Sequence, residues 1–417
     1  MRVLVLDGNE NQAVASVRSL ARAGHAVEVG SSASWSKAGL SRWSRGSFSY
    51  PSPERNLDAF VNCMVERVKV QPGTLILPMT ERTTLPLSAH RSEILAAGGR
   101  LVMPPHETVL RAFDKRQTTD LARSLGLNVP ATALLESLEQ ATEMSAGCSY
   151  PIVLKPRTSE EVLPDGKVHA TGAPVYARNA SEFLAAYQLL QARCASVLAQ
   201  EFIEGYGVGY FALLRHGEIR AEFGHRRIRD VRPTGSGSAL RVSVQPDVRV
   251  LDAGRKMLRA LNWHGAAMVE FRVRPDGAPV FMEVNGRFWN SLALAVYAGV
   301  DFPALMAELA ENGDARPPAS YRAGVRCRWW LGDFRHLVEV WRGKPAGYPG
   351  VFPGRLKTLI QFLAPVPGAV HDNFELGDPM PEFGDWADFF LRRLPAAMRK
   401  SSNRKPEAHA QRGYSHP

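Results

Sequence analysis

The chain has 417 residues, 45% of them hydrophobic and 22% charged, which is typical of a globular protein with a sizeable core and two or three domains. It begins with an apolar strand pattern rather than a secretory signal, and no apolar stretch approaches the roughly 18 residues of a membrane span, so we expect a cytoplasmic protein. The net charge is +10, but seven Lys or Arg against one Glu in residues 391–417 contribute 7 − 1 = +6 of it, so the basic character is mostly that of a tail.

Strand and helix patterns alternate over residues 1–104. Apolar runs at 3–6, 25–29, 74–77 and 100–103 predict strands, and helical patterns lie between them, including 54–69 and 88–97. This alternation predicts an α/β domain with a parallel sheet. The first turn lacks G-x-G-x-x-G, so no dinucleotide site is predicted. Glu81 follows the third strand at the ligand-binding edge of such a sheet, where a substrate contact and a surface salt bridge are both reasonable readings.

The pattern changes after Pro104-Pro105, a domain boundary. Helices are expected at 107–113, 115–125, 137–146 and 181–193, and strands at 150–156, 197–203 and 209–214. Residues 162–168 (VLPDGKV) predict a hairpin. We therefore expect an α+β domain over 105–312, with a small lobe at about 127–203 and a large lobe at about 204–312.

The most informative segment is 268–285, where Asp276-Gly277 separates two alternating runs. Asp-Gly is a strong signal for a two-residue hairpin turn. With these residues at the centre of the turn, paired positions sum to 553, so Glu270 faces Glu283 and Arg272 faces Phe281.

Alternation also sorts the side chains of this hairpin into two faces. The apolar face carries Val269, Phe271, Val273, Val280, Met282 and Val284; the other carries Glu270, Arg272, Phe281, Glu283 and Asn285. Directly opposed carboxylates repel each other, and a hard cation such as Mg²⁺ would relieve the repulsion. The alternative is a solvent-exposed hairpin whose glutamates separate into water or pair with Arg272.

The order Glu270, Glu283, Asn285, Arg287 resembles the E…E-x-N-x-R signature of the ATP-grasp superfamily. The resemblance implies that Glu270, Glu283 and Asn285 bind one or two Mg²⁺ ions, with Mn²⁺ as a substitute. It also implies that Arg287 stabilises the transferred phosphate, a role that suits a reaction catalysed by positioning and charge. We add Arg272, on the same face, to the candidate catalytic residues.

Further segments follow in the order that the family requires. Lys115 and Lys155 resemble its two ATP lysines, and residues 200–204 resemble the hinge that reads adenine. The implied ATP-binding residues are therefore Lys115, Lys155, Gln200, Glu201, Phe202, Ile203 and Glu204. The loop at 157–172 departs from the glycine-rich pattern, so either Arg157, Thr158 and Ser159 contact the phosphates or the lid works differently.

Four arginines and a Gly/Ser turn at 225–238 predict an anion-binding loop, with Arg226 and Arg227 as candidate substrate ligands. This segment is similar to that of carbamoyl-phosphate-synthase-like and D-aspartate-ligase-like ATP-grasp proteins. Asn290 and Glu81 complete the candidate substrate set, although packing is an equal reading for Asn290. Without interleaved aromatic residues, nucleic acid is a weak rival partner.

The resemblance covers roughly residues 1–310 and implies a carboxylate–amine ligase that forms an acyl phosphate and releases ADP and phosphate. The alternative is a nucleotide-binding protein of this fold with a regulatory or assembly role. The partners of the ligase would be a small carboxylate and an amine. We further expect a homo-oligomer.

The remaining residues match no family pattern. Residues 313–400 are expected to form a separate extension and 401–417 a disordered basic tail. The amphipathic stretch 386–400 fits either core packing or peripheral membrane contact. The four cysteines lie far apart in the sequence, without a C-x-x-C pair or a nearby His, which predicts reduced thiols and neither a disulfide framework nor a zinc site.

Overall fold

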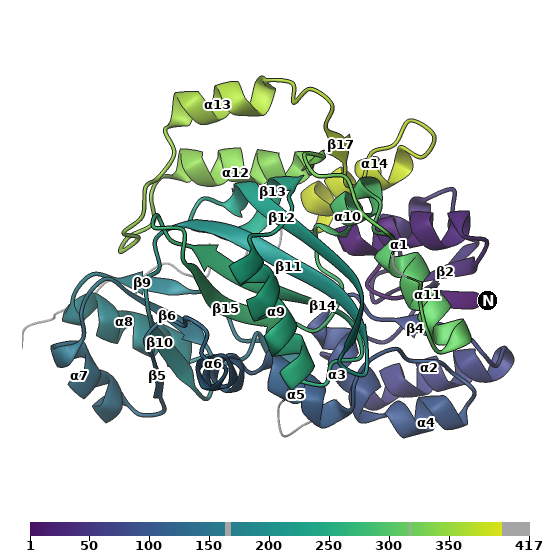
Figure 1. Ribbon diagram of the computed structural model, residues 1–417, viewed down its shortest axis with the longest axis horizontal. Coiled ribbons are helices and arrows are strands. Elements are labelled where there is room, and N and C mark those ends of the chain that lie inside the picture. The colour runs from purple at the N-terminus through teal and green to yellow at the C-terminus, as the bar shows by residue number, and fades with distance from the viewer. Residues whose placement is uncertain (163–167, 317, 394–417) are drawn as a thin grey trace, which may run out of the picture.

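A computed structural model of the protein describes residues 1–162, 168–316 and 318–393. Figure 1 shows an N-terminal domain and a small lobe at opposite ends of the molecule, with a large sheet between them and C-terminal helices along one side. The α/β fold of the first domain and the mixed α+β architecture of the rest confirm the predicted fold class.

The N-terminal domain is built on a parallel sheet of order β3-β2-β1-β4. Its strands are β1 (Arg2–Val5), β2 (Ala26–Ser31), β3 (Gly46–Ser49) and β4 (Leu75–Leu77), and its helices are α1 (Asn11–Arg22), α2 (Leu57–Val70), α3 (Glu81–Ala89) and α4 (Arg91–Ala96), with a 3₁₀ turn at Ala38–Leu40. Residues 100–103 form only an isolated bridge from Arg100 to Leu75 of β4, so the predicted fourth strand is wrong. The fourth strand of the sheet is β3, which pairs with β2 at the opposite edge.

The small lobe follows two connecting helices. Its elements are α5 (His106–Phe113), α6 (Lys115–Ser124), β5 (Thr132–Leu135), α7 (Leu138–Gly147), β6 (Ile152–Pro156), β9 (Val175–Ala177), α8 (Ala180–Gln191) and β10 (Val197–Glu201). Antiparallel pairing gives the order β5-β10-β6-β9. Strands β7 (Glu160–Val162) and β8 (Val168–Ala170) pair as predicted, and their turn lies outside the described residues.

The large lobe contains a seven-stranded sheet of order β15-β14-β11-β12-β13-β16-β17. The elements are β11 (Tyr206–Arg215), β12 (Glu218–Arg232), β13 (Ser236–Ser243), α9 (Val248–Ala260), β14 (Gly265–Val273), β15 (Pro279–Asn285), α10 (Leu292–Ala298), α11 (Phe302–Asn312), β16 (Arg326–Arg328) and β17 (Val370–His371). Strands β16 and β17 come from the segment expected to be separate, so that segment completes the sheet.

The other C-terminal elements are α12 (Trp330–Arg342), α13 (Arg355–Leu363), α14 (Met380–Asp388) and a π-helical turn (Phe389–Arg393). Helix α14 packs on the N-terminal domain, where Lys37 Nζ donates to Asp385 Oδ1 at 2.8 Å and both side chains are buried. Trp386 packs against Phe334. The expected basic tail and residues 394–400 of the amphipathic stretch lie outside the described residues.

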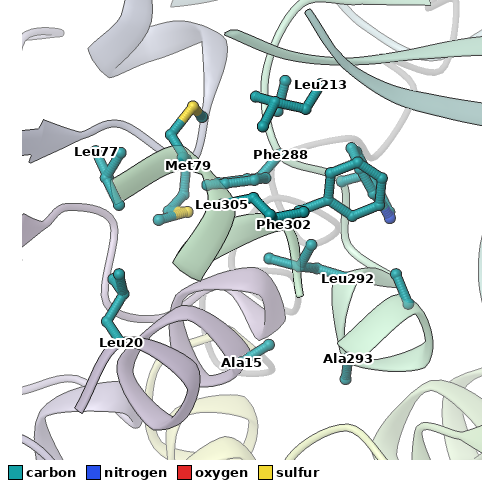
Figure 2. Close-up of a cluster of buried hydrophobic side chains, with 14 of the residues drawn as sticks. Ala15, Leu20, Leu77, Met79, Leu213, Phe288, Leu292, Ala293, Phe302 and Leu305 are labelled. Carbon is teal, nitrogen blue, oxygen red and sulfur yellow. The ribbon is translucent and has the colours of Figure 1, made fainter. Parts of the chain in front are cut away.

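An apolar core joins the N-terminal domain to the large lobe (Figure 2). Ala15 and Leu20 of α1 and Leu77 of β4 face Phe288, Leu292 and Phe302 from the large lobe. In the described part of the chain no single helix is long and apolar enough to cross a membrane; α10 and α11 pass that test only as a pair bent by 86°, and both contribute to this core. This core packs β1 and β4 of the N-terminal sheet against the large lobe, including β14, the strand that carries Glu270.

Candidate functional site

The carboxylate hairpin is formed by β14 and β15, and Glu270 is paired directly with Glu283. This central prediction is confirmed. The pairing of Arg272 with Phe281 is wrong, because Arg272 pairs with Val280 and Phe271 with Phe281. The turn is one residue longer than predicted, and a bulge between Glu270 and Phe271 restores the register at the carboxylates.

The bulge also changes which side chains face the core. Phe281 is 1% exposed and packs with Phe271, whereas Met282 lines a cavity beside Glu270 and Arg272. Both residues were expected on the opposite faces. Strict alternation fails here because the bulge inserts one residue into β15.

The two carboxylates have different electrostatic surroundings. Burial raises the pKa of Glu270, and although Arg227 Nη2 lies 2.5 Å from Glu270 Oε2 its charge does not fully offset that effect. Burial acts the same way on Glu283, but the ammonium groups of Lys115 and Lys155 outweigh it and lower the pKa of Glu283. The hairpin therefore keeps an ionised carboxylate beside two lysines.

Both lysines lie where the small lobe meets this hairpin. Burial and the nearby Lys115 ammonium lower the pKa of Lys155 to about 8, although Glu283 acts to raise it. Lys115 Nζ donates to Ser159 Oγ at 3.0 Å. An anion bound between the two lysines would stabilise both charges.

Arg287 lies at the end of the signature and is held by its neighbours. Its Nη1 donates to the backbone oxygen of Phe288 at 3.0 Å, and its Nη2 to Asn285 Oδ1 at 3.3 Å. Glu81 Oε1 is 3.7 Å from Nη2, and burial raises the pKa of Glu81 although Arg287 opposes this. The buried Nε of Arg287 has no partner among the described residues, which leaves a donor for a ligand.

A cavity of about 110 Å³ lies between the small and large lobes. It is lined by Lys155, hinge residues 200–203, Arg227, Glu270, Arg272 and Met282 among others. Gln200 is buried and donates to Thr132 Oγ1, and Glu201 pairs with Arg274. Of the predicted hinge contacts, Glu204 is exposed and does not line this cavity.

A second cavity, of about 520 Å³, lies between the N-terminal sheet and the hairpin. Glu283, Asn285, Arg287, Asn290 and Glu81 line it together. The hairpin therefore stands between two cavities, with Glu270 and Arg272 on one and Glu283, Asn285 and Arg287 on the other.

Three arginines that were predicted to contact a substrate or the phosphates lie in other surroundings than expected. Residues 226 and 227 lie on β12 rather than in a loop, so their side chains diverge. Arg227 binds Glu270, whereas Arg226 is exposed and stacks on Tyr206, away from both cavities. Arg157 is bonded to Asp114 Oδ2 at 2.8 and 2.6 Å, so its guanidinium is already engaged.

Sequence reasoning missed several residues of the larger cavity, including Gln12, Arg82 and Glu160. Gln12 follows the first turn, which was examined only for glycines. Glu160 lies in the loop at 157–172, which departs from the glycine-rich pattern, and its partner is Arg82 at 3.1 Å. No sequence signal links residues 82 and 160, because the contact joins two domains.

The chemistry of this donor set fits Mg²⁺ bound together with a nucleotide. Among the described residues no group of three or more His, Cys, Asp or Glu could hold a metal by itself. Two carboxylates and one amide oxygen leave coordination positions for phosphate oxygens, which is the usual way Mg²⁺ binds ATP. The orphaned buried Nε atoms of Arg272 and Arg287 also favour an anion here.

This fold, with a carboxylate hairpin facing two lysines between two lobes, is that of the ATP-grasp proteins. The family model "ATP-grasp in the biosynthetic pathway with Ter operon" matches residues 196–331, which include the hairpin. The predicted resemblance to this superfamily is thus confirmed.

Particular proteins are similar over longer stretches. The carbamoyl phosphate synthase large chain of Methanoculleus marisnigri is 26% identical over 54% of this chain, but the match spans only 22% of that relative. The L-amino acid ligase of Bacillus licheniformis has a similar fold (TM-score 0.58, 16% identity, 74% of this chain and 73% of that one). So does the biotin carboxylase domain of Hydrogenobacter thermophilus 2-oxoglutarate carboxylase, solved with MgADP and bicarbonate (TM-score 0.60, 15% identity, 78% and 73%).

Proposed function

We propose that this protein is an ATP-dependent carboxylate–amine ligase. The observation that carries the proposal is the pair Glu270 and Glu283, opposed in the sheet and placed between two cavities with Lys115 and Lys155 beside them. The similarity to carbamoyl phosphate synthase and to an L-amino acid ligase supports the ligase class.

The candidate site residues have separate roles in the two cavities. The hinge at 200–203 binds the adenine, and Lys115 and Lys155 bind the phosphates. Glu270, Glu283 and Asn285 would hold Mg²⁺, which when bound neutralises phosphate charge. Arg287 faces the larger cavity and stabilises the phosphoryl group as it is transferred.

The reaction has two steps in this proposal. A substrate carboxylate oxygen attacks the γ-phosphorus, the bond to the bridging oxygen breaks, and ADP leaves. An amine nitrogen then forms a bond to the acyl carbon, the bond from that carbon to the phosphate oxygen breaks, and the phosphate leaves with a proton from nitrogen. Positioning and charge stabilisation supply most of the catalysis in such a reaction.

The test is ADP release by the full chain with pooled carboxylic acids and amines, comparing wild type with Glu283→Gln. We expect release only with both pools, and a loss of at least about a hundredfold in the variant. A carboxylic acid labelled with ¹⁸O should pass one label to the released phosphate.

Nucleotide binding without any acid-dependent ADP release would instead support a regulatory or assembly role. Phosphate without the label would exclude the acyl phosphate step. Glu66→Gln, on an exposed face of α2, is the matched control because Glu66 is exposed and pairs with its neighbour Lys69.

A further inference from the structure

The larger cavity is rich in acidic groups. Among its described lining residues, five are carboxylates and two are guanidinium groups. The carboxylates are those of Asp7, Glu10, Glu81, Glu160 and Glu283. Since Glu283 and Arg287 belong to the phosphate site, the part of the cavity next to the N-terminal sheet carries the other four carboxylates against Arg82 alone.

Two of these carboxylates are already engaged. Asp7 accepts hydrogen bonds from Thr83 Oγ1 at 2.6 Å, Tyr50 Oη at 2.9 Å and the Thr80 backbone at 3.0 Å. It shapes the cavity wall rather than binding a ligand. Arg82 pairs with Glu160 at 3.1 Å and with Glu54 at 3.0 Å, so its charge is balanced within the protein, although Arg82 Nε and Glu160 Oε2 have no hydrogen-bond partner among the described residues.

Glu10 and Glu81 are the remaining acidic groups of this wall. Glu10 occupies the N-cap position of α1, but its side chain makes no capping hydrogen bond. Glu81 is 9% exposed, and its closest cation, Arg287, is 3.7 Å away, beyond direct hydrogen-bond distance. Both carboxylates can therefore accept hydrogen bonds from a ligand.

An independent observation comes from Gln12, which lines the same cavity and is 3% exposed. Its Nε2 donates to the Met79 backbone oxygen at 2.9 Å, which fixes the orientation of the amide. Its buried Oε1 has no partner among the described residues. A buried acceptor without a donor is costly, and a ligand with N–H groups would satisfy it.

We propose that this wall of the cavity binds the amine acceptor as its ammonium, through Gln12 Oε1, Glu10 and Glu81. An ammonium group has three donors and no acceptor, which matches three acceptors and no free cation. The proposal rests on the proposed ligase function. Before the nitrogen attacks, the ammonium releases one proton to water, and the second proton leaves with the phosphate as described above.

The experiment measures binding rather than turnover. Straight-chain primary amines of two to six carbons are titrated into the full chain with Mg²⁺ and a non-hydrolysable ATP analogue at neutral pH. The alcohol and the carboxylate of each length serve as matched probes. We expect the amines to bind, and to bind at least about tenfold more tightly than the other two series, because hydrogen bonds to a charged group contribute most.

Two variants locate the site. Gln12→Leu should weaken amine binding about tenfold, and Glu10→Gln about threefold or more, while affinity for the ATP analogue is unchanged. Glu10→Gln guards against misfolding, because Glu10 is half-buried and does not cap its helix. Preference for alcohols or carboxylates, absence of amine binding, or amine binding that neither variant weakens would overturn the proposal.

The outcomes separate this inference from the proposed function. Amine binding that both variants weaken, without acid-dependent ADP release, would leave the ammonium site standing and reject the ligase. ADP release that requires an amine but is indifferent to both variants would keep the ligase and reject this site.

Discussion

Glu270 and Glu283 face each other, yet each has its own counter-charge. Arg227 binds Glu270, whereas Lys115 and Lys155 act on Glu283. This asymmetry keeps both like charges in a largely buried place, where an unpaired carboxylate would be costly. It also leaves Glu283 exposed to the larger cavity, on the side where Arg287 stands.

A substitution of Arg287 tests its proposed role in stabilising the transferred phosphoryl group. Arg287→Lys keeps the charge but loses the planar donors, so we expect kcat to fall about a hundredfold while the KM for ATP changes less than about threefold. Steady-state kinetics with a substrate pair found in the pooled assay would measure both. Arg111→Lys, on an exposed position of α5, should leave both constants unchanged; an equal fall in that control, or none in Arg287→Lys, would refute the role.

The buried Glu382 should make the stability of the folded protein depend on pH. Burial, with a further contribution from Asp385, raises the pKa of Glu382 from 4.5 to about 7. A raised folded-state pKa means that stability is full below pH 4.5 and falls as the pH rises towards 7. Glu382→Gln should therefore be more stable than wild type by about 3 kcal/mol at pH 8, and by little at pH 4.5.

Urea unfolding at both pH values would measure this difference. Gln keeps an oxygen for the Trp386 Nε1 hydrogen bond, so the substitution changes the charge and little else. A stability difference that does not vary with pH would show that the carboxyl is not protonated in the folded state.

At the scale of secondary-structure elements, the hairpin of β14 and β15 shows which pairings can be predicted from sequence patterns. Alternation and the Asp-Gly turn predicted the Glu270–Glu283 pair correctly, because a later bulge compensated for a turn one residue longer. They misplaced Phe281 and Met282, since a bulge leaves no sequence signal as clear as a turn. Strand β3 was missed because Gly46 and Ser47 are exposed and give no apolar run.

The segment between α12 and α13 contacts the proposed nucleotide site in a way that its sequence did not suggest. Tyr348 is buried, with its ring 6.0 Å from Phe202 of the hinge and 4.9 Å from Tyr176. Tyr176 donates to the Thr234 backbone oxygen at 3.0 Å, which joins the two lobes beside the smaller cavity. The segment between α12 and α13 thus packs against the hinge through Tyr348.

Tyr348→Leu should raise the KM for ATP about tenfold, because the hinge and Tyr176 lose an aromatic neighbour. Tyr348→Phe keeps the ring and should change it less than about twofold. Nucleotide titration of both variants is the measurement. Equal effects from the two substitutions would mean that the ring does not position the hinge.

At the scale of the molecule, the parts are tied together by contacts between residues far apart in sequence. The apolar core of Figure 2 joins α1 to the large lobe, and Lys37 joins the N-terminal domain to α14. Sequence periodicity predicts which faces are apolar but not which faces meet. For that reason the hairpin was predictable, whereas the cavity wall at Gln12 and Arg82 was not.

Lys37→Met tests the tie to α14. Removing one partner of a buried ion pair leaves Asp385 without its cation, so we expect a loss of about 3–5 kcal/mol in the free energy of unfolding. Lys69→Met, in an exposed pair on α2, should cost less than about 1 kcal/mol. Chemical denaturation would compare them, and similar small losses would show that the buried pair adds little.

The proposed ligase activity depends on the opposed carboxylates holding a metal-bound nucleotide. Calorimetric titration of ADP, with Mg²⁺ and with EDTA, tests this most directly in wild type, Glu283→Gln and the control Glu66→Gln. We expect Mg²⁺ to tighten ADP binding at least about tenfold in wild type and in the control, and to have no such effect in Glu283→Gln. An equal effect of Mg²⁺ in all three proteins would contradict the assignment.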